Sequence, residues 1–110
     1  MQAWKTLLGV LILPAFLAAC SSRTPETALA GPALFKKHCA SCHGLDGKGK
    51  IAKIDMTKPG WQKSVTDEKI AQTIKNGVEA KGMPPFKTLL KDNEINMIIK
   101  DAVRKFGKGG

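Results

Sequence analysis

The stretch Cys39-Ala40-Ser41-Cys42-His43 decides the fold of this 110-residue chain. Two cysteines separated by two residues and followed directly by a histidine form C-x-x-C-H, the attachment sequence of a c-type haem. Each cysteine sulfur can form a thioether bond to a haem vinyl group, and His43 then follows where its imidazole can bind the iron. The spacing fits one helical turn, which places Cys39 and Cys42 on the same face.

Three other kinds of site also use paired cysteines. A structural zinc site needs four ligands, and the remaining candidates are Cys20, assigned a different role below, and His38, which is too close in sequence to complete a tetrahedron easily. A thioredoxin-like pair needs a βαβ setting, but no alternating or β-branched runs surround the motif. A disulfide closing so short a loop would remove little chain entropy. Haem attachment is therefore the favoured interpretation.

Residues 1–19 are predicted to form an export signal. Lys5 gives the segment a positive start, residues 7–17 are apolar, and small residues follow them. The apolar run is too short to span a bilayer comfortably. The chain is therefore expected to act outside the cytoplasm, which excludes nucleic acid as a partner.

The end of this signal predicts a lipid anchor. Residues 17–20, Leu-Ala-Ala-Cys, resemble the bacterial lipobox, and the resemblance implies cleavage before Cys20 and attachment of lipid to it. The alternative is ordinary signal-peptidase cleavage with a free Cys20, for which Leu17 is poorly placed. Ser21 follows, which resembles the pattern of lipoproteins sent to the outer membrane. The chain is thus expected on the periplasmic side of a bacterial membrane.

Residues 20–30 predict a flexible tether, because they are mostly small and polar and include Pro25. Residues 31–110 then form one domain of about 80 residues, which is small for a self-sufficient core. A covalently held haem would supply the missing apolar bulk. The formal charge of +9 favours partners with acidic surfaces or an anionic membrane.

Apolar periodicity and end signals predict three helices, over residues 31–43, 66–76 and 92–106. Thr66 suits the start of the second helix and Gly77 suits its end. Residues 44–63 and 78–90 are expected to be irregular. Within the first of these loops, Trp61 is a candidate donor to a haem propionate, and a half-buried structural role is an equal alternative.

The sixth position of the iron decides between electron transfer and ligand binding. His38 adjoins the haem motif and cannot easily reach the face opposite His43. Of the methionines beyond the export signal, Met97 falls in a regular helix and Met56 lies early in the first loop. Met83 lies in a loop stiffened by the two prolines that follow it, so it is predicted to be the second axial ligand. The alternative is that Met83 is an apolar lid over an open haem.

These features resemble the small bacterial class I cytochromes c, over residues 31–106. The matching residues are Phe35, the haem motif with the following glycines and Asp46, then residues 74–77, 82–84 and 86, and residues 92–95. The resemblance implies an all-α fold of three to four helices packed around one covalently attached haem c. It implies that Cys39 and Cys42 form the thioethers and that His43 and Met83 bind the iron.

The resemblance also implies a function. The chain is expected to be a single-electron carrier and not an enzyme, tethered to a membrane through Cys20, with redox proteins as partners. Lys48, Lys81 and Lys87 are candidates to steer acidic partners to the haem edge. One alternative is a haem-bearing subunit fixed in a larger respiratory complex. Another is a ligand-binding or peroxidase-like haem protein.

Two departures from the family pattern affect packing. The family often has a proline soon after the haem motif, whose carbonyl accepts a hydrogen bond from the second nitrogen of the axial histidine. Here no proline follows until Pro59, so that acceptor is unassigned. The last helix usually presents an aromatic residue to the first, but this chain has Ala102 in the corresponding stretch. The crossing is therefore predicted to pack Ile98, Ala102 and Phe106 against Phe35.

Overall fold

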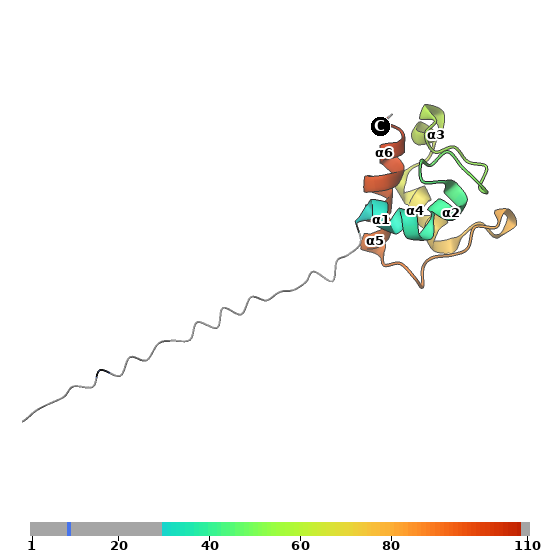
Figure 1. Cartoon of the computed structure of the whole chain (residues 1–110). Coiled ribbons are helices and arrows are strands. Elements are labelled where there is room, and N and C mark those ends of the chain that lie inside the picture. The colour runs from blue at the N-terminus through green and yellow to red at the C-terminus, as the bar shows by residue number, and fades with distance from the viewer. Residues whose placement is uncertain (1–8, 10–29, 109–110) are drawn as a thin grey trace, which may run out of the picture.

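A computed structural model describes residues 9 and 30–108 (Figure 1). The predicted signal, the predicted lipid site Cys20 and the tether up to residue 29 therefore lie outside the described residues, Gly9 apart. The helical elements are α1 (Gly31–His38), α2 (Ala40–His43), α3 (Pro59–Ser64), α4 (Asp67–Asn76), η1 (Glu79–Lys81), α5 (Asp92–Ile98), η2 (Ile99–Val103) and α6 (Arg104–Phe106). Within the described part the only β feature is an isolated bridge between Val78 and Met83. The predicted all-α class is confirmed.

The first helix crosses the C-terminal helical run formed by α5, η2 and α6 (Figure 1). At the crossing, a Cβ on Gly31 would overlap the carbonyl of Met97, so only glycine allows this approach. Further along, the rings of Phe35 and Phe106 meet edge to face, with centroids 5.0 Å apart. Such pairs add stability beyond area burial. The predicted contact of Phe35 with Phe106 is confirmed.

The C-terminal run differs from the regular helix that its periodicity predicted. Its middle, η2, is π-helical, a geometry that occurs mostly as single-turn bulges inside α-helices. The wider turn still buries Ile99, Ala102 and Val103. A pattern of apolar residues spaced three and four apart cannot distinguish this bulge from an uninterrupted α-helix.

Helix α4 begins and ends as predicted. The Thr66 hydroxyl oxygen accepts a hydrogen bond from the Lys69 backbone N–H at 3.1 Å, which satisfies one of the free donors at the helix start. Gly77 ends the helix with a φ of 70°, in the left-handed region where glycine is favoured. Ile70 and Ile74 are buried and fasten α4 to the core.

One expected irregular segment is partly wrong. Residues 44–63 were expected to be irregular, but Pro59 and Gly60 open the short helix α3. Proline is well placed in the first turn of a helix, where its missing N–H costs nothing. Residues 44–58 before α3 have no helix, as predicted.

Candidate haem site

The haem motif lies where α1 gives way to α2. Cys39 sits in the break between the two helices, with φ −118°, so the predicted single helix is interrupted there. The N–H of His43 still donates to the Cys39 carbonyl at 2.9 Å, which closes one helical turn over the motif. Cys39 is buried, Cys42 is half-buried, and both are free thiols. The two sulfurs are thus available for thioether bonds.

The surroundings of Cys39 are apolar. Burial, and to a lesser degree the neighbouring Cys42, raises the pKa of the Cys39 thiol to about 11. Thiolates are the form that binds zinc or attacks disulfides, and the raised pKa disfavours that form. The setting therefore matches a thiol packed against an apolar group better than a redox-active or metal-binding thiolate.

His43 is held as a neutral imidazole. Burial lowers its pKa below the ordinary value, and neutral imidazole is the form that binds metals. Its Nδ1 is buried without a hydrogen-bond partner among the described residues, in line with the acceptor that the sequence left unassigned. Buried polar atoms normally have a partner. The hydrogen-bonding capacity of the His43 imidazole is therefore not satisfied by the described residues alone.

A loop closes over the end of α2. The carbonyl of Cys42 accepts hydrogen bonds from the N–H groups of residues 50, 51 and 52, at 2.9 to 3.0 Å. The carbonyl of His43 accepts one from Gly49 at 2.8 Å. A Cβ on Gly49 would overlap the carbonyl of Ala52, so the loop can turn this tightly only with glycine. The backbone that follows the motif is thereby wrapped around it.

The loop that carries Met83 hangs from the end of α4. Val78 and Met83 exchange two backbone hydrogen bonds, at 2.9 and 3.1 Å. The N–H of Phe86 donates to the Ile74 carbonyl at 2.9 Å. A Cβ on Gly77 would overlap the Met83 carbonyl, so the loop passes directly against the end of the helix. Met83 itself is half-buried and borders an open hollow of about 470 Å³.

An aromatic contact joins this loop to the haem motif. The Phe86 ring meets the His38 ring edge to face, with centroids 6.0 Å apart. His38 directly precedes Cys39, and Phe86 lies shortly after Met83. The fold therefore brings the Met83 loop beside the segment that carries the two cysteines.

The residues fit a c-type haem. The chain offers two free thiols, one of them in an apolar setting, a histidine held neutral after them, and a thioether in a loop beside them. Within the described residues, no group of three or more His, Cys, Asp or Glu side chains could hold a metal ion by itself. Trp61 is half-buried against the core, so its suggested contact with a propionate stays a prediction.

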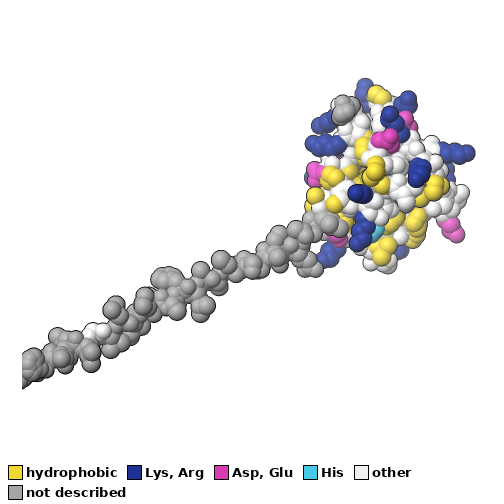
Figure 2. All heavy atoms as spheres, viewed as in Figure 1, with side chains coloured by type: hydrophobic (Ala, Val, Ile, Leu, Met, Phe, Trp, Pro, Cys, Tyr) yellow, Lys and Arg dark blue, Asp and Glu magenta, His cyan; other side chains and the backbone are white. Residues whose placement is uncertain are grey.

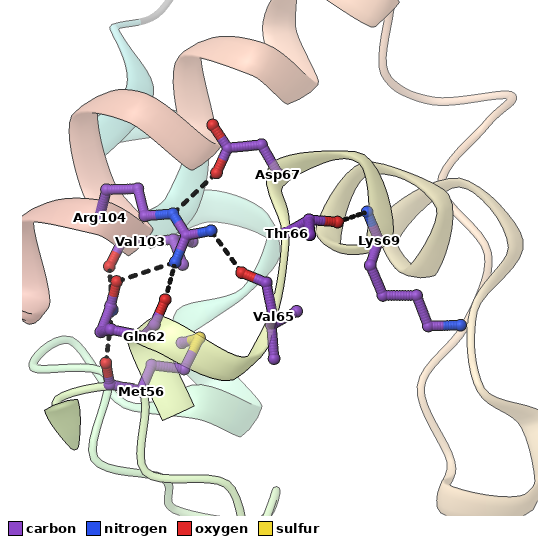
Figure 3. Close-up of polar contacts among 8 residues, drawn as sticks. All are labelled: Met56, Gln62, Val65, Thr66, Asp67, Lys69, Val103 and Arg104. Carbon is purple, nitrogen blue, oxygen red and sulfur yellow. Dashed lines mark hydrogen bonds and ion pairs between the residues drawn. The ribbon is translucent and has the colours of Figure 1, made fainter. Parts of the chain in front are cut away.

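Sequence reasoning missed two polar residues, Gln62 and Arg104 (Figure 3). The Gln62 amide nitrogen donates to the carbonyls of Met56 and Val103, at 2.6 and 2.9 Å. The Arg104 guanidinium donates to both oxygens of Gln62. Neither residue belongs to a local motif, and the two are far apart in the chain. From the sequence alone, a glutamine and an arginine on separate helices are expected to be surface residues, and only the fold shows that they contact each other.

No helix in the described part of the chain is long and apolar enough to cross a membrane.

Residues 26–100 match the family model described as cytochrome c oxidase, cbb3-type, subunit III. The cbb3-type cytochrome c oxidase subunit CcoP of Rubrivivax gelatinosus is 34% identical over 69 residues, which are 63% of this chain and 22% of that protein. The chain thus spans about a fifth of the length of this relative.

Solved structures show the same likeness. The KustC0563 c-type cytochrome is 30% identical with a TM-score of 0.64, and the match covers 70% of this chain and 96% of that one. A point mutant of that cytochrome is 32% identical with the same TM-score, covering 70% and 98%. The likeness therefore extends beyond the fold to the sequence, because about a third of the residues are identical over most of both chains.

Proposed function

The chain belongs to the family of the cbb3-type cytochrome c oxidase subunit III and is a small class I cytochrome c. We therefore propose that it carries single electrons on one covalently attached haem, with His43 and Met83 as axial ligands. The observation that carries the proposal is the motif at α2. There, two free thiols, of which Cys39 is buried in an apolar setting, are followed by a half-buried imidazole whose neutral form is favoured.

Each residue has a distinct task in this proposal. The haem supplies a one-electron couple when bound. Cys39 and Cys42 fix it to the chain, and His43 and Met83 offer two neutral ligand atoms from separate segments. Because neutral ligands and an apolar surround disfavour the extra positive charge of the oxidised state, they favour a high reduction potential. A closed ligand set leaves no position for a substrate, which separates a carrier from a peroxidase-like protein.

The optical spectrum of the oxidised protein tests the ligand set. Methionine ligation gives a weak sulfur-to-iron charge-transfer band near the red limit of the visible. We expect Met83→Ala to lose this band and to lower the midpoint potential, because a neutral sulfur ligand is removed. Met97→Leu is the matched control, since Met97 is also half-buried but lies on α5. A band that survives in Met83→Ala would contradict the assignment of Met83.

A second candidate is a haem-bearing subunit fixed in a respiratory complex. It is favoured by the relative, which is a subunit of a cbb3-type oxidase and is about three times as long as this chain. A lipid on Cys20 would tether either form to the periplasmic side of a membrane, and the outer membrane is favoured by Ser21.

Membrane extraction distinguishes these forms. We expect the native chain to fractionate with membranes and Cys20→Ser to become extractable without detergent. After detergent extraction, a free carrier runs at the size of one small chain in its micelle. A fixed subunit instead co-purifies in constant ratio with other polypeptides. Equal fractionation of native chain and Cys20→Ser would contradict the lipid anchor.

A further inference from the structure

The side chain of Gln62 joins three segments that are distant in sequence (Figure 3). Lying on α3, it donates to the carbonyl of Met56 in the preceding loop at 2.6 Å and to that of Val103 in the C-terminal run at 2.9 Å. Val103 is among the last residues of that run, whose carbonyls have no partner within the helix. One amide therefore satisfies a helix end and a loop carbonyl together.

Arg104 fixes the orientation of this amide. Its Nη1 donates to the backbone carbonyl of Gln62 at 2.8 Å and to the side-chain oxygen at 3.1 Å. Nη2 donates to the Val65 carbonyl at 2.6 Å, and Nε donates to Asp67 at 2.7 Å. Because the amide oxygen faces the guanidinium, the amide nitrogen must face the two carbonyls. All three guanidinium nitrogens are thus engaged, and Nη1 is the one that holds the glutamine.

The Met56 peptide leads from this network to the haem motif. Its carbonyl accepts from Gln62, and its N–H donates to the Gly47 carbonyl at 2.8 Å. The N–H of Gly47 donates to Gly44 at 3.2 Å, and the N–H of Gly44 donates to Ala40 in α2 at 2.8 Å. The Met56 side chain is buried in the core. A continuous series of hydrogen bonds therefore connects Arg104 with the helix that carries His43.

We propose that Gln62 and Arg104 are positioning residues that hold the 44–58 loop against α2 and so keep water from the His43 side of the haem. The inference rests on the proposed function. The arginine is already paired with Asp67, so its role here is to place the loop. When the loop loosens, water gains access and stabilises the oxidised, more positive state, which lowers the reduction potential.

Two variants that preserve charge test this role in the full, haem-loaded chain. Gln62→Leu keeps most of the side-chain volume but cannot donate, and Arg104→Lys keeps the charge but loses the planar fork. We expect both to lower the midpoint potential, so that the ratio of reduced to oxidised protein at a fixed potential falls about threefold. We also expect faster hydrogen exchange at the Met56 amide, which reports the loop directly.

Ile70→Val is the matched control for a general loss of stability. Ile70 is buried on α4 and takes no part in this network, and its truncation weakens the core. We expect its midpoint potential to equal that of the wild type, even where denaturant unfolding shows a stability loss similar to that of Gln62→Leu. If Gln62→Leu yields no haem-loaded protein, Arg104→Lys decides.

Midpoint potentials of both variants that match the wild type would overturn the inference, whether or not the Met56 amide exchanges faster. A potential that falls equally in Ile70→Val would also overturn it, since the shift would then follow stability alone. Failure of the proposed function looks different. In that case the wild type itself carries no attached haem or shows no reversible one-electron couple.

Discussion

At the scale of single residues, His43 decides how the site responds to acid. In the proposed ligand set, a proton and the iron compete for its ring nitrogen. Burial lowers the pKa of His43 below the ordinary value near 6.5, so the folded chain shifts this competition towards the metal. Protonation favours the unfolded chain only as the pH falls below that ordinary value, because the unfolded state then binds the proton more readily. Acid should therefore displace the His43 ligand only at a pH below the ordinary pKa of histidine.

We expect the visible spectrum of the oxidised protein to stay constant as the pH falls from 7 to 5. Ligand loss should begin only in stronger acid, because both burial and the iron oppose protonation of His43. Absorption spectra recorded along a pH titration measure this. His38→Gln should leave the profile unchanged, since His38 is not expected to bind the iron. A spectral transition centred near pH 6.5 in both the wild type and His38→Gln would contradict this account of His43.

At the scale of elements, α4 supports the Met83 loop. The loop is attached to the end of this helix through the Val78–Met83 bridge and the Phe86 and Lys87 N–H groups, which donate to carbonyls of α4. Gly77 makes the attachment possible, because its φ of 70° turns the chain and its missing Cβ leaves room for Met83. The position of the sulfur thus depends on a glycine outside the loop tip.

Gly77→Ala should therefore weaken the sulfur ligand. The added Cβ would overlap the Met83 carbonyl, and a non-glycine residue at positive φ is strained by about 1 kcal/mol or more. We expect lower stability and a weaker charge-transfer band in the oxidised protein. Gly60→Ala is the control, since nothing lies near its Cβ and alanine in a helix is better by roughly 0.5–1 kcal/mol. A full-strength band in Gly77→Ala would contradict this role.

Which elements the sequence predicts depends on how local their causes are. The last helix and α4 follow from apolar spacing, and Thr66 and Gly77 mark the ends of α4 because caps are local hydrogen bonds. Helix α3 was missed because proline and glycine suit both a turn and a helix start. The π segment was missed because it keeps the same residues buried.

The residues of the site also differ in how far local sequence predicts them. The haem motif is contiguous in sequence, so C-x-x-C-H predicts the sulfurs and the first ligand together. Met83 could be chosen only from its proline-stiffened loop and by excluding other methionines, because the ligand proposed to face it, His43, lies in another segment. Gln62 and Arg104 act through backbone carbonyls of Met56 and Val65, and every residue type has such a carbonyl. No side-chain pattern could therefore have revealed them.

At the scale of the whole molecule, charge governs encounters with partners. The formal charge is +9, and Figure 2 shows basic side chains spread around the visible face of the domain. Lys48, Lys81 and Lys87 are exposed. Exposed charges raise association rates with acidic partners at low salt, and the effect declines as the Debye length shortens to about 3 Å at 1 M.

Oxidation by the anion hexacyanoferrate(III) measures this steering. We expect the second-order rate constant to fall with ionic strength. Lys48→Gln, Lys81→Gln and Lys87→Gln should each lower it severalfold at low salt and by little at 1 M. Lys100→Gln is the control, because Lys100 is also exposed but lies on the C-terminal run. Rate constants that ignore salt, or that respond equally to all four changes, would contradict a steering role for the three lysines.

The attachment of the Met83 loop to α4 also sets the order in which the molecule fails. In the proposed arrangement the covalently held haem and His43 share one short helix, whereas Met83 depends on a few backbone hydrogen bonds at the end of α4. Segments held by few exposed hydrogen bonds open locally at a lower free energy than the core. Under mild denaturation we therefore expect the sulfur to leave first while the haem stays attached. The opened form would keep its cofactor but lose its closed ligand set, turning an electron carrier into a protein with a vacant iron position.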